Sequence, residues 1–159
     1  MTEVSPKLDE SWKTQLIDEF GAPYFSALKE FLLNEKRNNK TIFPPGAKPG
    51  GNYSPGILTD DTLYISGQGG EDGNGKIPGD FAAEVKQSLD NIAAILKAAE
   101  MSPADVVSVQ VYLTDAKTFP RMNAVYTEFF KDPRPTRTTV VVAKLVGPGS
   151  IEITVTAKK

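Results

Sequence analysis

The chain has 159 residues, of which 40% are apolar and 24% charged, with a formal net charge of -2. These values fit one soluble domain with a hydrophobic core and a short appendage, and they give no electrostatic reason to expect nucleic acid as the main partner. The sequence contains neither cysteine nor histidine, which excludes disulfides, a cysteine nucleophile and a histidine base. With no apolar run of about 18 residues and no secretion signal at the start, we expect no membrane contact and a cytoplasmic protein.

The first 45 residues predict a helical hairpin and a linker. Apolar residues recur every four positions in residues 8–20, and a second apolar stripe follows Pro23, which suits the first turn of a helix. Prolines and glycines then concentrate in residues 41–51, which is typical of a linker. We therefore predict an N-terminal extension over residues 1–45 and a second unit over residues 46–159.

The next part of the chain predicts two strands and a long helix. Residues 53–58 favour a short strand, and residues 62–66 favour a strong one that ends in a glycine-rich loop. The loop lacks the Gly-Lys-Ser/Thr sequence, and no helix directly follows it, so a phosphate-binding loop is rejected. Asp80 is expected to cap a helix whose apolar face is formed by Phe81, Val85, Leu89, Ile92, Ile95 and Leu96.

The remaining elements complete an α+β pattern. We predict a half-buried strand over residues 106–113, a helix over residues 119–130, and two final strands over residues 138–145 and 151–157 that form a hairpin. The order β-β-α-β-α-β-β predicts one sheet with two helices on one face. Because several strands are apolar on both sides, we expect the other face to be covered by oligomerisation or by the N-terminal hairpin.

Arg137 is the first candidate for a functional residue. It follows two prolines and precedes a β-branched run, so a rigid strand would support its planar guanidinium. Such a group can bind a carboxylate or phosphate through two parallel hydrogen bonds. The alternative is an ordinary surface ion pair at a strand edge. Glu152, within Ile-Glu-Ile, is either a catalytic carboxylate or a half-exposed strand residue.

From about residue 45 to the C-terminus, the chain resembles the reactive-intermediate deaminase (RidA) family, once described as L-PSP-type endoribonucleases. Seven short segments carry the resemblance in order: Tyr53-Ser54, Tyr64–Gln68, Gln87–Ile92, Val111–Asp115, Met122–Phe130, Pro135–Arg137 and Ile151–Ile153. The resemblance implies a chorismate-mutase-like fold, a homotrimer with clefts between subunits, and no metal or organic cofactor. It implies a hydrolase that deaminates enamine and imine acids, such as 2-aminoacrylate, to 2-oxo acids and ammonia.

The same resemblance implies roles for particular residues. Arg137 would bind the carboxylate of a small substrate, and Glu152 would position or activate water, while the pocket would be lined by Tyr53, Ser66, Gly67, Phe119, Asn123 and Thr139. The sequence alone favours the core over the pocket for Phe119. Arg137 and Glu152 are expected on neighbouring strands of the hairpin, from which both would reach one pocket.

Three positions depart from the family pattern. Many relatives have cysteine where this chain has Thr139, a second glutamate where it has Thr154, and glutamine where it has Pro55. These departures leave the substrate open, and they keep two alternatives: a non-catalytic module that binds small carboxylates, and a ribonuclease.

Residues 9–46 carry a second resemblance, to the N-terminal segment of family 1 uracil-DNA glycosylases. It rests on Ser11–Lys13, Pro23–Phe25, Leu28–Leu32 and Lys40–Gly46. The water-activating Gln-Asp-Pro-Tyr-His element of those enzymes is absent, so glycosylase activity is not expected.

Overall fold

The structure is a computed structural model that describes residues 18, 21–23, 26, 39–47 and 52–159. Most of the predicted N-terminal helical hairpin, and most of the segment that resembles glycosylases, lies outside the described residues. Residues Asn38–Lys159 form one compact unit, which carries the sheet and both long helices. Among the described residues, no helix is both long and apolar enough to cross a membrane.

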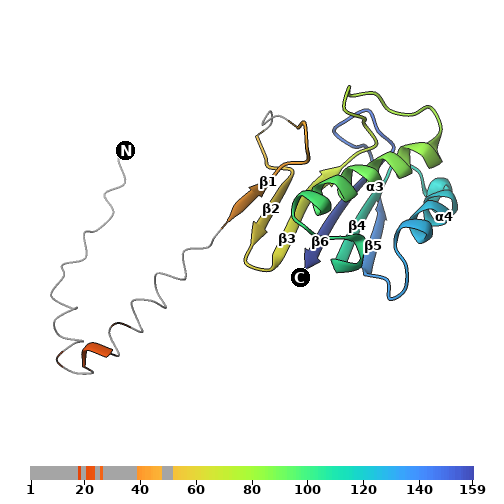
Figure 1. The fold of residues 1–159 in the computed structure, drawn as a ribbon. Coiled ribbons are helices and arrows are strands. Elements are labelled where there is room, and N and C mark those ends of the chain that lie inside the picture. The colour runs from red at the N-terminus through yellow and green to blue at the C-terminus, as the bar shows by residue number, and fades with distance from the viewer. Residues whose placement is uncertain (1–17, 19–20, 24–25, 27–38, 48–51) are drawn as a thin grey trace. The chain divides into compact units, whose positions relative to one another are not determined.

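The fold is one sheet with two helices on one face, as the sequence predicts, but the sheet has six strands because β1 (Lys40–Ile42) was not predicted (Figure 1). The strands are β1 (Lys40–Ile42), β2 (Gly56–Thr59), β3 (Thr62–Gln68), β4 (Val106–Leu113), β5 (Thr136–Val141) and β6 (Ile151–Lys158), and their order in the sheet is β1-β2-β3-β6-β4-β5. The helices are α3 (Phe81–Ala98) and α4 (Phe119–Phe129), with short 3-10 turns at Pro103–Asp105 and Ala116–Thr118.

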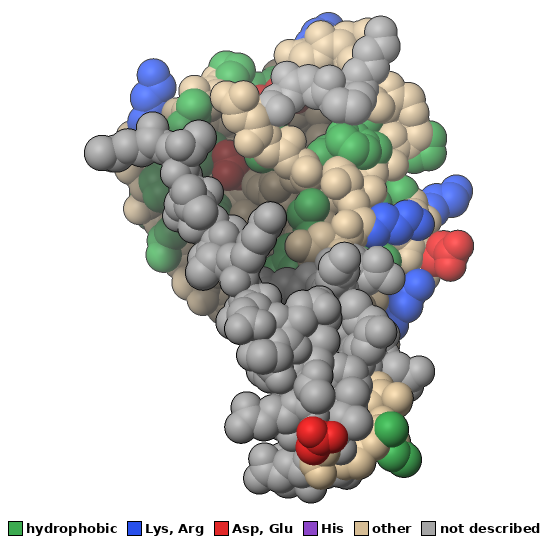
Figure 2. Space-filling view, turned by 90° about the vertical axis from the view of Figure 1, so that its left-hand side faces the viewer, with side chains coloured by type: hydrophobic (Ala, Val, Ile, Leu, Met, Phe, Trp, Pro, Cys, Tyr) green, Lys and Arg blue, Asp and Glu red, His purple; other side chains and the backbone are tan. Residues whose placement is uncertain are grey.

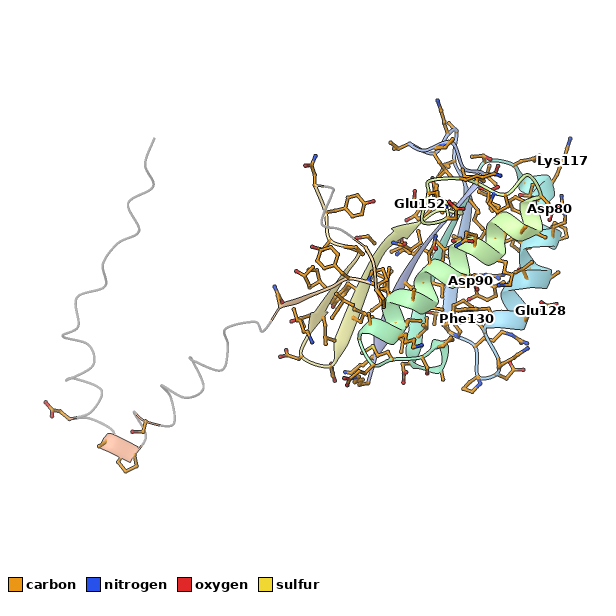
Figure 3. The ribbon with its side chains drawn as sticks, turned by 45° about the horizontal axis from the view of Figure 1, so that its top comes forward. Asp80, Asp90, Lys117, Glu128, Phe130 and Glu152 are labelled. Atoms are coloured by element: carbon orange, nitrogen blue, oxygen red, sulfur yellow. The ribbon has the colours of Figure 1, made fainter. Side chains whose placement is uncertain are left out.

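Helix α3 begins and ends where its sequence predicts. The Asp80 carboxylate accepts a hydrogen bond from the Ala83 N–H at 3.1 Å, and this bond is the main reason that the pKa of Asp80 is lowered (Figure 3). The predicted apolar face packs on the sheet, with Val85, Leu89 and Ile92 almost fully buried. The alternating strands β4 and β6 supply the other half of this core.

Strand β1 differs from the prediction, because its residues fall within the stretch that the composition assigned to a linker. Lys40–Ile42 pair antiparallel with β2, and Ile42 is buried in the core. A short run with one β-branched apolar side chain suffices here because the existing edge of the sheet supplies its hydrogen bonds. The division of the chain between residues 45 and 46 stays a prediction.

The predicted C-terminal hairpin is wrong. Strand β5 pairs in parallel with β4, whereas β6 lies between β3 and β4 and is antiparallel to both. The parallel connection from β4 to β5 runs through α4, as parallel strands require a long crossover. β4 therefore separates β5 from β6, and the two candidate residues on them are not on neighbouring strands.

We predict that Ile92→Ala lowers the free energy of unfolding by about 3 kcal/mol, because it removes a fully buried side chain from the interface between α3 and the sheet. Lys97→Ala, at an exposed position of the same helix, should change it by less than about 0.5 kcal/mol. Urea unfolding at one fixed protein concentration measures both. Equal values for the two variants would show that α3 does not pack as described.

Candidate functional site

The eight candidate residues fall into two groups that lie at different places in the folded structure. One group surrounds a pocket of about 560 Å³ and contains Tyr53, Ser66, Gly67 and Glu152. The other surrounds Arg137 and contains Phe119, Asn123 and Thr139. We call the first the Glu152 pocket and the second the Arg137 site.

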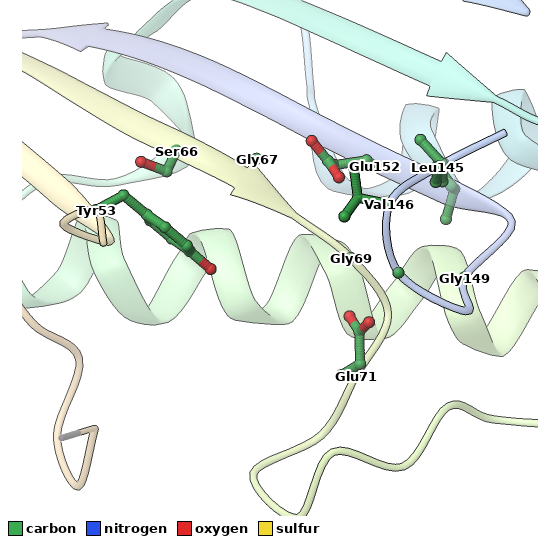
Figure 4. Close-up of a pocket in the computed structure, with 11 residues that line it drawn as sticks. Tyr53, Ser66, Gly67, Gly69, Glu71, Leu145, Val146, Gly149 and Glu152 are labelled. Carbon is green, nitrogen blue, oxygen red and sulfur yellow. The ribbon is translucent and has the colours of Figure 1, made fainter. Parts of the chain in front are cut away.

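The Glu152 pocket lies at the end of β3, beside the loop that leads into β6 (Figure 4). The Glu152 side chain lies directly over Gly67. A Cβ atom at position 67 would be only 2.7 Å from Glu152 Cδ, so this packing requires glycine. The Ser66 hydroxyl donates a hydrogen bond to the Ser54 carbonyl at 2.7 Å, which ties β3 to the segment that carries Tyr53.

Sequence reasoning missed part of this pocket. Its lining also includes Gly69, Glu71, Ile151 and four residues of the loop before β6, namely Leu145, Val146, Gly147 and Gly149. The loop residues carry no periodic pattern, so nothing in the sequence marks them. Glu71 directly follows the glycine-rich stretch after the second predicted strand. A single acidic residue in a loop does not by itself indicate a binding site.

A polar stripe on α3 holds the walls of the pocket. Glu84, Ser88 and Asn91 are spaced so that they lie along one face of the helix. The Ser150 N–H donates to Glu84, the Ser88 hydroxyl donates to the Gln68 carbonyl at 2.8 Å, and the Asn91 amide donates to two carbonyls, those of Gly69 at 3.1 Å and Glu71 at 2.9 Å. Buried polar groups are thus paired with the backbone that they position.

The Arg137 site lies on β5, beneath α4. The Arg137 guanidinium donates to the Asn123 side-chain carbonyl at 2.8 Å, and its carbon lies 4.5 Å from the centre of the Tyr126 ring and 5.6 Å from that of Phe119. Aromatic faces attract such a cation. Within the described residues, Arg137 forms no ion pair with a carboxylate. The described part of the chain therefore does not pair Arg137 with a carboxylate, which is what the surface ion-pair alternative required.

Hollows of about 420 and 460 Å³ lie on either side of the guanidinium. Two hydroxyls at this site, those of Thr139 and Tyr126, are buried and have no hydrogen-bond partner among the described residues. Burial raises the pKa of the Tyr126 phenol, while the nearby cations of Arg137 and Arg134 act in the opposite direction. Tyr126 is buried in the core, and its ring and neutral phenol also form part of this site.

Arg137 and Glu152 of one chain do not meet, contrary to the sequence-based expectation. In the register of the sheet, Arg137 is opposite Val109 of β4, and Glu152 is opposite Tyr112. Val109 faces the helices and is buried, whereas Tyr112 is on the other face. Arg137 and Glu152 are also separated by two strand spacings, about 10 Å, across the sheet. Along the strands they are separated by three residues, about another 10 Å.

Comparison with known proteins agrees with this fold. Residues 45–159 match the family described as Endoribonuclease L-PSP. The chain therefore belongs to the L-PSP endoribonuclease family, to which the RidA proteins also belong. A RutC family protein of Sulfurisphaera tokodaii is 43% identical over 123 residues, which are 76% of this chain and 98% of that protein.

Two further relatives relate the family to an activity and to a solved fold. The 2-iminobutanoate/2-iminopropanoate deaminase of Bos taurus is 44% identical over 105 residues, covering 65% of this chain and 77% of that protein. The crystal structure of RidA from an Antarctic Psychrobacter is 36% identical, with a TM-score of 0.72 over 76% of this chain and 99% of that one. The matched family begins at residue 45, so the resemblance of residues 9–46 to glycosylases stays a prediction.

We predict that Asn91→Ala increases hydrogen–deuterium exchange in residues 68–72, because the carbonyls of Gly69 and Glu71 lose their shared donor. The same change should destabilise the protein by about 1–3 kcal/mol. Asp90→Ala is the matched control, since Asp90 forms only an exposed ion pair with Lys86. Equal exchange in the two variants would mean that Asn91 does not hold this segment.

Proposed function

We propose that the protein is a hydrolase that deaminates 2-imino and enamine acids to 2-oxo acids and ammonia. The single observation that carries the proposal is a guanidinium with no carboxylate partner in the described chain, held by an amide and two aromatic rings beside open space. The bovine relative, named as a 2-iminobutanoate/2-iminopropanoate deaminase, supports the reaction type. We expect the protein to act in the cytoplasm.

The chemistry follows from the residues available. Arg137 would bind the substrate carboxylate through two parallel hydrogen bonds and so orient the adjacent C=N bond. The Glu152 carboxylate would accept a proton from a water molecule as the water oxygen bonds to the imine carbon. The same group would deliver this proton to the nitrogen, which gives a carbinolamine. It would then transfer the proton of the new hydroxyl to the nitrogen as the C–N bond breaks, so that ammonia leaves and the C=O bond of a 2-oxo acid forms.

We further propose that each active site is completed by a second copy of the chain, within a homotrimer. The Glu152 pocket is acidic, since Glu71 and Glu152 line it and no lysine or arginine among the described residues does. The Arg137 site is cationic and lies on the other face of the sheet, at its edge strand. The two are complementary in charge but separated within one chain, so pairing them between copies resolves the separation.

Exposed apolar side chains support such an assembly. Val140 and Val141 on the edge strand β5, and Val146 in the loop beside the Glu152 pocket, are all exposed, and Val146 is fully so. An edge strand with bare valines favours association with another chain. The acidic pocket, by contrast, offers nothing to a phosphodiester, so the ribonuclease alternative has no support from the described site.

We predict that Arg137→Ala lowers kcat/KM for 2-iminobutanoate by at least about 100-fold, since it removes a charge-assisted, bidentate contact. Arg137→Lys should also be impaired, because an ammonium cannot reproduce the planar fork. Arg121→Ala, which removes an exposed arginine that is paired with Asp80 and lines neither hollow of the Arg137 site, is the matched control. The imino acid is generated in situ and its disappearance followed by semicarbazide trapping. Saturable binding of 2-oxobutanoate without turnover would instead favour the binding-module alternative.

A second prediction tests the shared site. Arg137→Ala and Glu152→Gln should each be inactive alone, whereas mixed trimers of the two, obtained by co-expression with different tags and purified on both, should recover about a third of wild-type activity. That fraction is expected because about one site of three in every mixed trimer joins an intact arginine to an intact glutamate. Mixed assemblies as inactive as both parents would show that each chain uses its own pair.

A further inference from the structure

We propose that Glu71 makes the pocket select imino acids whose side chain ends in a cation, a guanidinium or an ammonium group. This inference rests on the proposed deaminase function and names the substrate class for the same site. Glu71 lines the pocket, but the proposed hydrolysis does not use it.

Glu71 is held in place rather than free at the surface. Its backbone carbonyl accepts the Asn91 amide at 2.9 Å, and its side chain lies against Gly69, with Oε1 3.3 Å from where a Cβ of Gly147 would be. Figure 4 shows its carboxylate directed toward Gly69, on the side of the chain where Glu152 also lies. The carboxylate therefore bridges the two walls of the pocket, the end of β3 and the loop before β6.

The two carboxylates occupy different depths of the same pocket. Glu152 lies over Gly67 and Glu71 lies against Gly69, two residues further on. In an extended segment that spacing is about 7 Å. If the imine carbon is beside Glu152, a side chain directed along Gly69 ends at Glu71.

No cation of the described chain neutralises Glu71. Its carboxylate takes part in no hydrogen bond or ion pair among the described residues, and none of the pocket-lining residues is basic. On the face shown in Figure 2, hydrophobic and uncharged side chains predominate and basic side chains lie toward the edges. A partly buried carboxylate without a partner favours a ligand that brings a positive charge and disfavours one that is acidic.

The test compares two imino acids of nearly equal size, made in situ by an amino-acid oxidase from arginine and from citrulline. The imino acid from arginine ends in a guanidinium, whereas the one from citrulline ends in a neutral ureido group. For the wild type, kcat/KM should be about tenfold higher for the arginine-derived imino acid, as one charge-assisted hydrogen bond suggests. In Glu71→Gln the ratio should fall to about one.

Glu128→Gln is the matched control, because it removes the same charge from an exposed position on α4, outside the pocket. Its ratio should stay at about ten. Acceleration of both imino acids with a ratio near one in the wild type, or an unchanged ratio in Glu71→Gln, would overturn this inference and leave the proposed function standing. No acceleration of either imino acid, nor of 2-iminobutanoate, would overturn the proposed function and this inference with it.

Discussion

The structure is organised around a cation that the described part of its own chain leaves without an anion. Arg137 is fixed by the Asn123 amide and two aromatic rings, so its orientation is set before any ligand arrives. A guanidinium held this way loses less side-chain entropy on binding than a free one, which favours tight and oriented capture of a small carboxylate. The proposed chemistry requires that a substrate enters one of the hollows beside this guanidinium.

The sheet topology is the reason that we propose a site shared between two chains. With β4 between β5 and β6, the arginine points toward the helices while Glu152 lies on the opposite face. An imine with an adjacent carboxylate is intrinsically easy to hydrolyse, so orientation, a positioned water and one carboxylate suffice. A reaction that needs so few catalytic groups is compatible with a sequence without histidine or cysteine. If the proposed shared site is right, assembly is a condition of activity and not only a source of stability.

The sequence predicted those features of the fold that depend on local pattern. The Asp80 cap, the apolar face of α3 and the alternation of β4 are all found where expected, because burial and hydrogen bonding of neighbouring residues determine them. The pairing of β5 was wrong, because a short loop of glycine and proline favours a hairpin locally, whereas the sheet order depends on contacts distant in the chain. Glu71 was missed because only the folded backbone brings it against Gly147.

The most direct test of the central claim is a crystal structure of the assembled protein with bound 2-oxobutanoate. The account predicts that the guanidinium of Arg137 from one copy holds the ligand carboxylate, while Glu152 of a second copy lies within hydrogen-bond reach of the ligand's C2 oxygen or of the water beside it. A ligand bound away from Arg137, or an Arg137 paired with a protein carboxylate across the interface, would contradict the account.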